Sequence, residues 1–134
     1  AWQTRDLEPA HAAARILEET IARTPEGSTH AGLLQAQNIP LSTPVLEAAA
    51  VLGNGSEITA QDTVPFCVWV LGRHLRDFEE AMWQTLSVLG DRDTTCAMVA
   101  GALAPTLETL PSVWLARREP LPTLGSPLAE STPN

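Results

Sequence analysis

The apolar positions of this chain recur at helical spacing over most of its length. From Pro9 onward, Ile16, Leu17 and Ile21 fall on one face of a 3.6-residue period, with an acidic residue just before the segment. Polar side chains occupy the positions between them. This pattern predicts an amphipathic helix that ends near Arg23.

Three more helices are predicted in the middle of the chain. Residues 31–37 form a short helical candidate that stops before the next proline. A helix over residues 44–51 can be capped by Ser42 or Thr43 and ends at a glycine-bearing loop. Residues 64–71 are apolar almost all round, which suits the buried core helix of the fold.

The remaining elements are also helical. Asp77 precedes an apolar stripe that reaches Leu89, so another amphipathic helix is expected here. Residues 95–103 predict a helix of small side chains that the backbone of a neighbour can approach closely. The residues that would allow this approach are Ala97, Ala100, Gly101 and Ala104. Pro111 can start a last turn that contains Trp114.

The fold class that follows is all-α, because no stretch shows sustained alternation of apolar and polar residues. We expect an orthogonal multi-helix bundle with Trp69 and Trp83 in its core. Residues 1–119 are assigned to one helical domain, and residues 120–134 to a disordered, proline-rich tail. The first residues include no starting methionine or signal core, which indicates a cut through a longer chain.

Composition excludes two classes of partner. The 134 residues carry a formal net charge of -8, with sixteen acidic side chains against eight arginines and no lysine, so nucleic acid is not an expected partner. The apolar windows are far shorter than the roughly 20 residues that cross a bilayer, so no membrane span is expected. Cys67 and Cys96 lack ligand spacing and are expected to be reduced, buried thiols of a cytoplasmic protein.

The segment with the clearest chemistry is residues 90–95 (GDRDTT). Asp91 and Asp93 are followed by the hydroxyls of Thr94 and Thr95, and two carboxylates with a hydroxyl, without a histidine or thiolate beside them, suit a hard cation such as Mg²⁺ or Mn²⁺. The alternative is that Asp93 only caps the next helix while Asp91 is a solvated turn residue. Spacing alone favours the cap. Gly90 permits a tight turn that aims both carboxylates to one side.

A second candidate is the loop at residues 52–58 (LGNGSEI) between two helices. Its glycines allow a sharp turn or a close approach to a ligand. A phosphate-binding loop with a lysine is excluded because the chain has no lysine. The alternative function of the segment is a helix stop followed by a connector.

Three blocks in this order resemble the ADP-ribosylglycohydrolase family, which includes the dinitrogenase reductase-activating glycohydrolase. They are residues 48–55 (AAAVLGNG), 62–66 (DTVPF) and 90–103 (GDRDTTCAMVAGAL). The order and spacing of the blocks also match the family. The resemblance spans roughly residues 7–118, and Pro111 and Trp114 resemble the family's closing segment.

The resemblance implies a compact helical bundle around two divalent metals, Mg²⁺ or Mn²⁺. Enzymes of the family hydrolyse the bond that joins ADP-ribose to a protein acceptor or a small molecule, and the metals polarise the ribose hydroxyls and position a water at the anomeric carbon. The metal ligands implied for this chain are Asp91, Asp93 and Thr94. The residues implied to border the ADP-ribose are Gly53, Gly55, Ser56 and Glu57.

One departure from the family limits these expectations. The family's other metal ligands come from an amino-terminal acidic segment, and nothing before Leu52 resembles that segment. We therefore expect a carboxy-terminal part of the family domain that needs a complementary amino-terminal half or a homo-oligomer for activity. The alternative is an inactive helical protein that binds ADP-ribose or is purely structural. Arg92 could pair with a ligand phosphate or with a neighbouring carboxylate.

Overall fold

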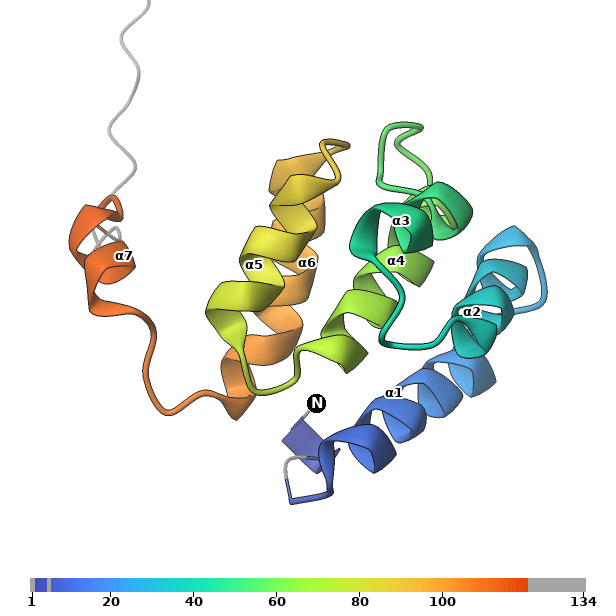
Figure 1. The fold of residues 1–134 in the computed structure, drawn as a ribbon, viewed down its shortest axis with the longest axis horizontal. Coiled ribbons are helices and arrows are strands. Elements are labelled where there is room, and N and C mark those ends of the chain that lie inside the picture. The colour runs from blue at the N-terminus through green and yellow to red at the C-terminus, as the bar shows by residue number, and fades with distance from the viewer. Residues whose placement is uncertain (1, 5, 121–134) are drawn as a thin grey trace, which may run out of the picture.

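The fold is a bundle of α-helices in the computed structural model, which describes residues 2–4 and 6–120 (Figure 1). The α-helices of the described part are α1 (Pro9–Arg23), α2 (Ser28–Asn38), α3 (Val45–Leu52), α4 (Ala60–Arg73), α5 (Phe78–Ser87), α6 (Arg92–Leu103) and α7 (Ser112–Arg117). Short 3-10 turns form η1 (Trp2–Thr4) and η2 (Ala104–Thr106). No strand occurs among these residues, so the all-α prediction is confirmed. The tail predicted to be disordered lies outside the described residues from residue 121 onward.

Helix α4 is the central element, as its apolar sequence predicts. It contacts α1, α2 and α3 on one side and α5 and α6 on the other (Figure 1). Phe66, Trp69 and Val70 on α4 are almost completely buried, because neighbours surround the helix on nearly every face. Helix α2 packs closest: a Cβ on Gly32 would lie only 2.6 Å from the Pro65 ring. The buried position predicted for Trp69 is therefore confirmed.

The boundaries of several helices differ from the expected ones, and α2 and α3 show why. Helix α2 begins at Ser28, three residues early, because Gly27 takes a φ of 156° and its carbonyl accepts the N–H of Ala31 at 2.9 Å. Pro44 precedes α3 with extended backbone angles, and no side chain caps this helix. The predicted cap by Ser42 or Thr43 is therefore wrong.

Two predictions about packing are also wrong. Trp83 is 56% exposed, and its ring instead meets the edge of the Trp114 ring on α7, with 6.3 Å between centroids. The close approach predicted for four small residues of α6 is wrong for three of them, and only Ala100 packs against the core of the described part of the chain. A Cβ on Gly101 would meet nothing within 4 Å, and Ala97 and Ala104 are exposed. Small side chains permit a close approach but do not supply the apolar area that would drive it.

The two cysteines are free thiols. Cys67 is buried as expected, and burial, followed by the nearby Cys96, raises the pKa of its thiol to about 12. Cys96 is only half-buried, so the prediction of burial holds for one of the two. Among the described residues, none of the helices has the length and apolar content to span a bilayer.

Candidate functional site

The two segments singled out in the sequence lie against each other at one end of the bundle (Figure 1). One is the glycine loop, residues 53–58, between α3 and α4; the other is the aspartate turn, residues 88–94, between α5 and α6. Asn54 joins them with two hydrogen bonds. Its carbonyl oxygen accepts the N–H of Asp91 at 3.1 Å, and its side-chain amide donates to the carbonyl of Val88 at 3.1 Å.

Asp62 at the start of α4 gives the glycine loop its shape. Its carboxylate accepts the N–H of Asn54 at 3.3 Å and that of Glu57 at 2.8 Å. Its backbone carbonyl accepts the N–H of Gly55 at 2.9 Å. The side-chain oxygen of Asn54 accepts both the N–H and the hydroxyl of Ser56, at 3.1 Å and 2.7 Å. The loop is therefore held by side chains from inside it and from the next helix.

These contacts leave the loop without a free backbone donor. The N–H of Gly53 donates to Ala49 in the last turn of α3, and the N–H of Ile58 donates to Gly55. Every N–H from residue 53 to residue 58 is thus used within the protein. A phosphate site made of backbone N–H groups, as found in anion-binding loops, does not fit this loop. Its exposed polar side chains are the hydroxyl of Ser56 and the carboxylate of Glu57.

The glycines of the site are explained by close approach of backbone to backbone. Gly53 and Gly55 have φ values of 92° and 87°, which side chains other than glycine rarely adopt. A Cβ on Gly55 would lie 2.9 Å from the Cβ of Asp91. A Cβ on Gly90 would lie 1.9 Å from the carbonyl oxygen of Asn54. Glycine at these positions lets the loop touch the turn.

Asp91 is the N-cap of α6, and it brings the predicted ligands together. Its carboxylate accepts the N–H of Thr94 at 3.3 Å, and its carbonyl accepts the hydroxyl of buried Thr95 at 2.7 Å. The pKa of the Asp91 carboxyl is lowered by a hydrogen bond with the Asp93 carboxyl and then by the hydroxyl and N–H of Thr94. The Asp91 carboxylate therefore lies close to both Asp93 and Thr94.

The structure corrects the alternative in which Asp93 caps the helix and Asp91 is a solvated turn residue. The residue that caps the helix is Asp91, and Asp93 lies in the first turn with an exposed side chain. The assignment of the cap to Asp93 was wrong because α6 begins at Arg92, three residues earlier than the pattern of small residues indicated. Asp93 and Thr94 are left open to solvent, where they can meet a ligand.

The donor set suits a hard cation but is incomplete. Two carboxylates and a hydroxyl are oxygen donors of the kind that Mg²⁺ and Mn²⁺ prefer. Among the described residues, however, no group of three or more histidine, cysteine, aspartate or glutamate side chains is placed to hold a metal. Within the described part of the chain these three side chains do not make a complete metal site, and their role as metal ligands stays a prediction. The guanidinium of Arg92 lies near Cys96, and neither proposed role for it is decided.

Two residues of the site were not picked out as functional from the sequence. Asn54 was overlooked between its flanking glycines, and Asp62 was taken only as a residue before the core helix. A signal was available for Asp62, since an acidic residue in a first helical turn can accept N–H groups of the preceding loop. For Asn54 the partners are 34 residues away, and local sequence gives no sign of them.

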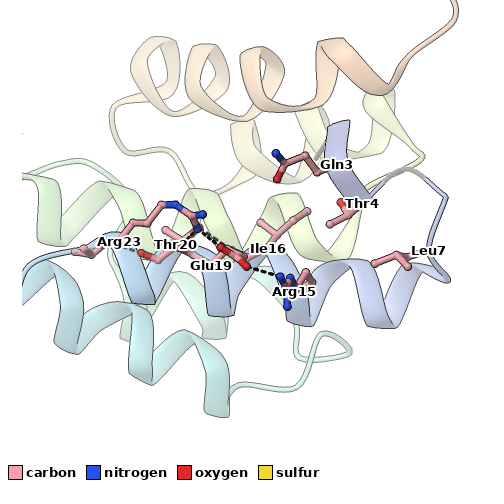
Figure 2. A pocket seen from close by; sticks show the side chains of 9 residues that line it. Gln3, Thr4, Leu7, Arg15, Ile16, Glu19, Thr20 and Arg23 are labelled. Atoms are coloured by element: carbon pink, nitrogen blue, oxygen red, sulfur yellow. Dashed lines mark hydrogen bonds and ion pairs between the residues drawn. The ribbon is translucent and has the colours of Figure 1, made fainter.

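A separate groove of about 910 Å³ lies between η1 and α1, and no candidate residue lines it. Figure 2 shows Gln3 of η1 facing Ile16 and Glu19 of α1 across this groove. Glu19 forms ion pairs with both Arg15 and Arg23 on its own helix. Exposed ion pairs of this spacing contribute little to stability because solvent screens them, so they are a minor feature of α1.

Comparison with known proteins identifies the family. The family model described as ADP-ribosylglycohydrolase matches residues 3–132, which extends past both ends of the range expected from the motifs. No curated protein and no solved structure matches the chain significantly. The family match includes the glycine loop and the aspartate turn, which are in contact in the structure. The chain therefore belongs to the ADP-ribosylglycohydrolase family.

Proposed function

We propose that this chain supplies part of the divalent-metal site of an enzyme that hydrolyses ADP-ribosyl bonds. The observation that carries the proposal is the position of Asp91, beside the exposed Asp93 and Thr94, at the start of α6, where its backbone N–H is bonded to the glycine loop. Two carboxylates at the amino end of a helix are each stabilised by the helix dipole, but as like charges they repel each other. A shared cation is one partner that relieves this repulsion.

Asp91, Asp93 and Thr94 would hold Mg²⁺ or Mn²⁺. When bound, the cation supplies a positive charge that polarises substrate oxygens and lowers the pKa of a bound water. The family resemblance implies a pair of such ions in the complete site, with the remaining ligands from an amino-terminal half or from another copy of the chain. The role of the described residues is to orient three oxygen donors in advance.

The substrate side of the proposal follows from the hydrogen bonds of the loop. Because its backbone N–H groups all donate within the protein, the loop offers a ligand hydrogen-bond acceptors. It is therefore suited to bind hydroxyl groups rather than phosphates. We place ribose hydroxyls of an ADP-ribosylated protein or small molecule against the exposed carboxylate of Glu57. Ser56, whose hydroxyl donates to Asn54, keeps acceptor capacity on the same loop. Gly53 and Gly55 act by allowing the loop to pack.

A second candidate function is a helical protein that binds ADP-ribose, or serves only as a scaffold, without hydrolysis. The lack of a third acidic ligand among the described residues favours it, since a cation held by two carboxylates and a hydroxyl keeps many water ligands and binds weakly. In this case Asp91 acts mainly as the cap of α6. The two functions differ in whether removing negative charge, with the cap retained, changes metal binding.

The test is calorimetric titration of Mn²⁺ and Mg²⁺ into the wild type and the Asp91→Asn, Asp93→Asn double variant. Asparagine caps a helix about as well as aspartate, so the variant loses charge but keeps the cap. Asp77→Asn is the matched control, because Asp77 caps α5 by the same kind of bond, at 3.0 Å from the N–H of Glu80. We expect binding in the wild type and control that is lost in the double variant. Equal binding in all three proteins would remove the metal-site proposal.

A further inference from the structure

We infer that Asn54 is a positioning residue that makes the glycine loop and the aspartate turn a single unit. The inference rests on the proposed function only where it concerns metal binding; the mechanical link is independent of it. Asn54 holds the turn at two points, through its side-chain amide on Val88 and its carbonyl on the N–H of Asp91. Its side-chain oxygen meanwhile holds Ser56 of its own loop.

The conformation between the two points is unusual. Leu89 has a φ of 65°, in the left-handed region that a leucine rarely adopts, and its side chain is 73% exposed. The side chain of Leu89 therefore gains little burial that would offset the strain. The bonds from Asn54 to Val88 and Asp91 enclose Leu89 and Gly90 and fix the path of the chain there. Strain sustained by surrounding contacts is a feature of functional sites.

The consequence for the site is a fixed direction for Asp91. Its peptide N–H points to Asn54, and its carbonyl is held by the N–H and hydroxyl of Thr95. Because both the N–H and the carbonyl of Asp91 are held, the backbone that carries its carboxylate has a fixed orientation at the first turn of α6. Loss of the Asn54 side chain would free the Val88 end of the turn and the Ser56 end of the loop together. With Asn54 intact, a cation at Asp91 and a ligand at the loop should strengthen each other's binding, because both stabilise the same linked conformation.

A double-mutant cycle tests the mechanical link without a metal. Leu89→Gly removes the left-handed strain, so it should raise the melting temperature of the otherwise wild-type full chain. In the Asn54→Ala background the turn can relax by itself, and the gain from Leu89→Gly should shrink or vanish. The greater flexibility of glycine in the unfolded chain is common to both backgrounds and cancels. Equal gains in both backgrounds would overturn the inference.

Mn²⁺ titration tests the effect on the metal site. Partners that orient metal ligands typically change metal affinity 10–100-fold, and we expect Asn54→Ala to weaken Mn²⁺ binding about tenfold. Asn38→Ala is the control, because Asn38 is an exposed asparagine whose amide also donates to a backbone carbonyl, that of Leu34 at 2.9 Å. If Asn54→Ala is too unstable, Asn54→Ser removes the amide donor to Val88 without adding a charge beside Asp91.

The outcomes separate the inference from the proposed function. Wild-type binding of Mn²⁺ with unchanged affinity in Asn54→Ala would overturn the positioning role and leave the metal site standing. Absence of Mn²⁺ binding by the wild type would overturn the metal site, and the cycle with Leu89 would then decide the inference alone. Weaker binding in Asn54→Ala, unchanged binding in Asn38→Ala and a non-additive cycle would support both.

Discussion

Gly90 lies just before helix α6, and Gly101 lies within it. The structure predicts opposite effects of an alanine substitution at the two positions. A Cβ on Gly90 would lie 1.9 Å from the carbonyl oxygen of Asn54, where no side chain can swing aside. A Cβ on Gly101 would meet nothing within 4 Å. Only the first substitution forces apart the contact that joins the glycine loop to the aspartate turn.

The magnitudes follow from these surroundings. At Gly90, overpacking costs about 1–3 kcal/mol, and the strained bond from Asp91 to Asn54 contributes about 1 kcal/mol more when it is lost. We therefore expect Gly90→Ala to lower the free energy of unfolding by about 2–4 kcal/mol. At Gly101 the backbone is already helical and a Cβ has free space. Gly101→Ala should therefore raise the free energy of unfolding by about 0.5–1 kcal/mol.

Urea unfolding followed by circular dichroism measures both variants under one set of conditions. The slope of the transition should stay the same for Gly101→Ala, so that the shift in midpoint reports stability alone. A Gly90→Ala variant within about 0.5 kcal/mol of the wild type would refute the close contact between loop and turn. Equal destabilisation by both substitutions would refute the solvent-exposed face of α6.

Three further predictions concern other parts of the bundle. Burial, then the charge of Arg73, lowers the pKa of His74 below its ordinary 6.5. The contribution of neutral His74 to stability should therefore be complete above about pH 6.5 and be lost as the pH falls below it. His74→Gln should weaken the dependence of the urea midpoint on pH below about pH 6.5. Cys96 should react with a thiol reagent at pH 8 well before Cys67, whose thiol is buried with a pKa of about 12; equal rates would contradict the packing of α4 on α6. Gly32→Ala should destabilise by about 1 kcal/mol in the same urea assay, because a Cβ 2.6 Å from the Pro65 ring outweighs the gain in helix propensity.

The helices could be predicted from the sequence where the apolar pattern is long and its ends are marked. Helix α1 runs from Pro9 to Arg23 as expected, and Asp77 caps α5 through the N–H of Glu80. Trp83 was placed in the core because it lies on an apolar stretch of α5. Periodicity gives the direction of a side chain but not what faces it, and the contact with Trp114 of α7 leaves the Trp83 side chain exposed.

The candidate site was predicted as two segments but not as one site. Residue types and spacing point to oxygen donors at Asp91, Asp93 and the following hydroxyls, and the family resemblance is what selects Thr94. The contact of this turn with Asn54 depends on how α3, α4 and α6 pack, and no local pattern contains that information. Gly55 and Gly90 are an example. Glycines in a loop suggested a close approach to a ligand, and in the structure these two make room for the neighbouring segment of the chain.

The most direct measurement of the metal site is Mn²⁺-induced broadening of backbone amide signals in NMR spectra of the full chain. Mn²⁺ broadens signals of nearby nuclei, so the measurement locates the ion as well as detecting it. We expect broadening centred on Asp93 and Thr94 that extends across the contact to Gly55 and Glu57 and disappears in the Asp91→Asn, Asp93→Asn variant. Broadening centred instead on the acidic first turn of α5, or uniform weak broadening of all exposed acidic residues, would contradict a metal site at the start of α6.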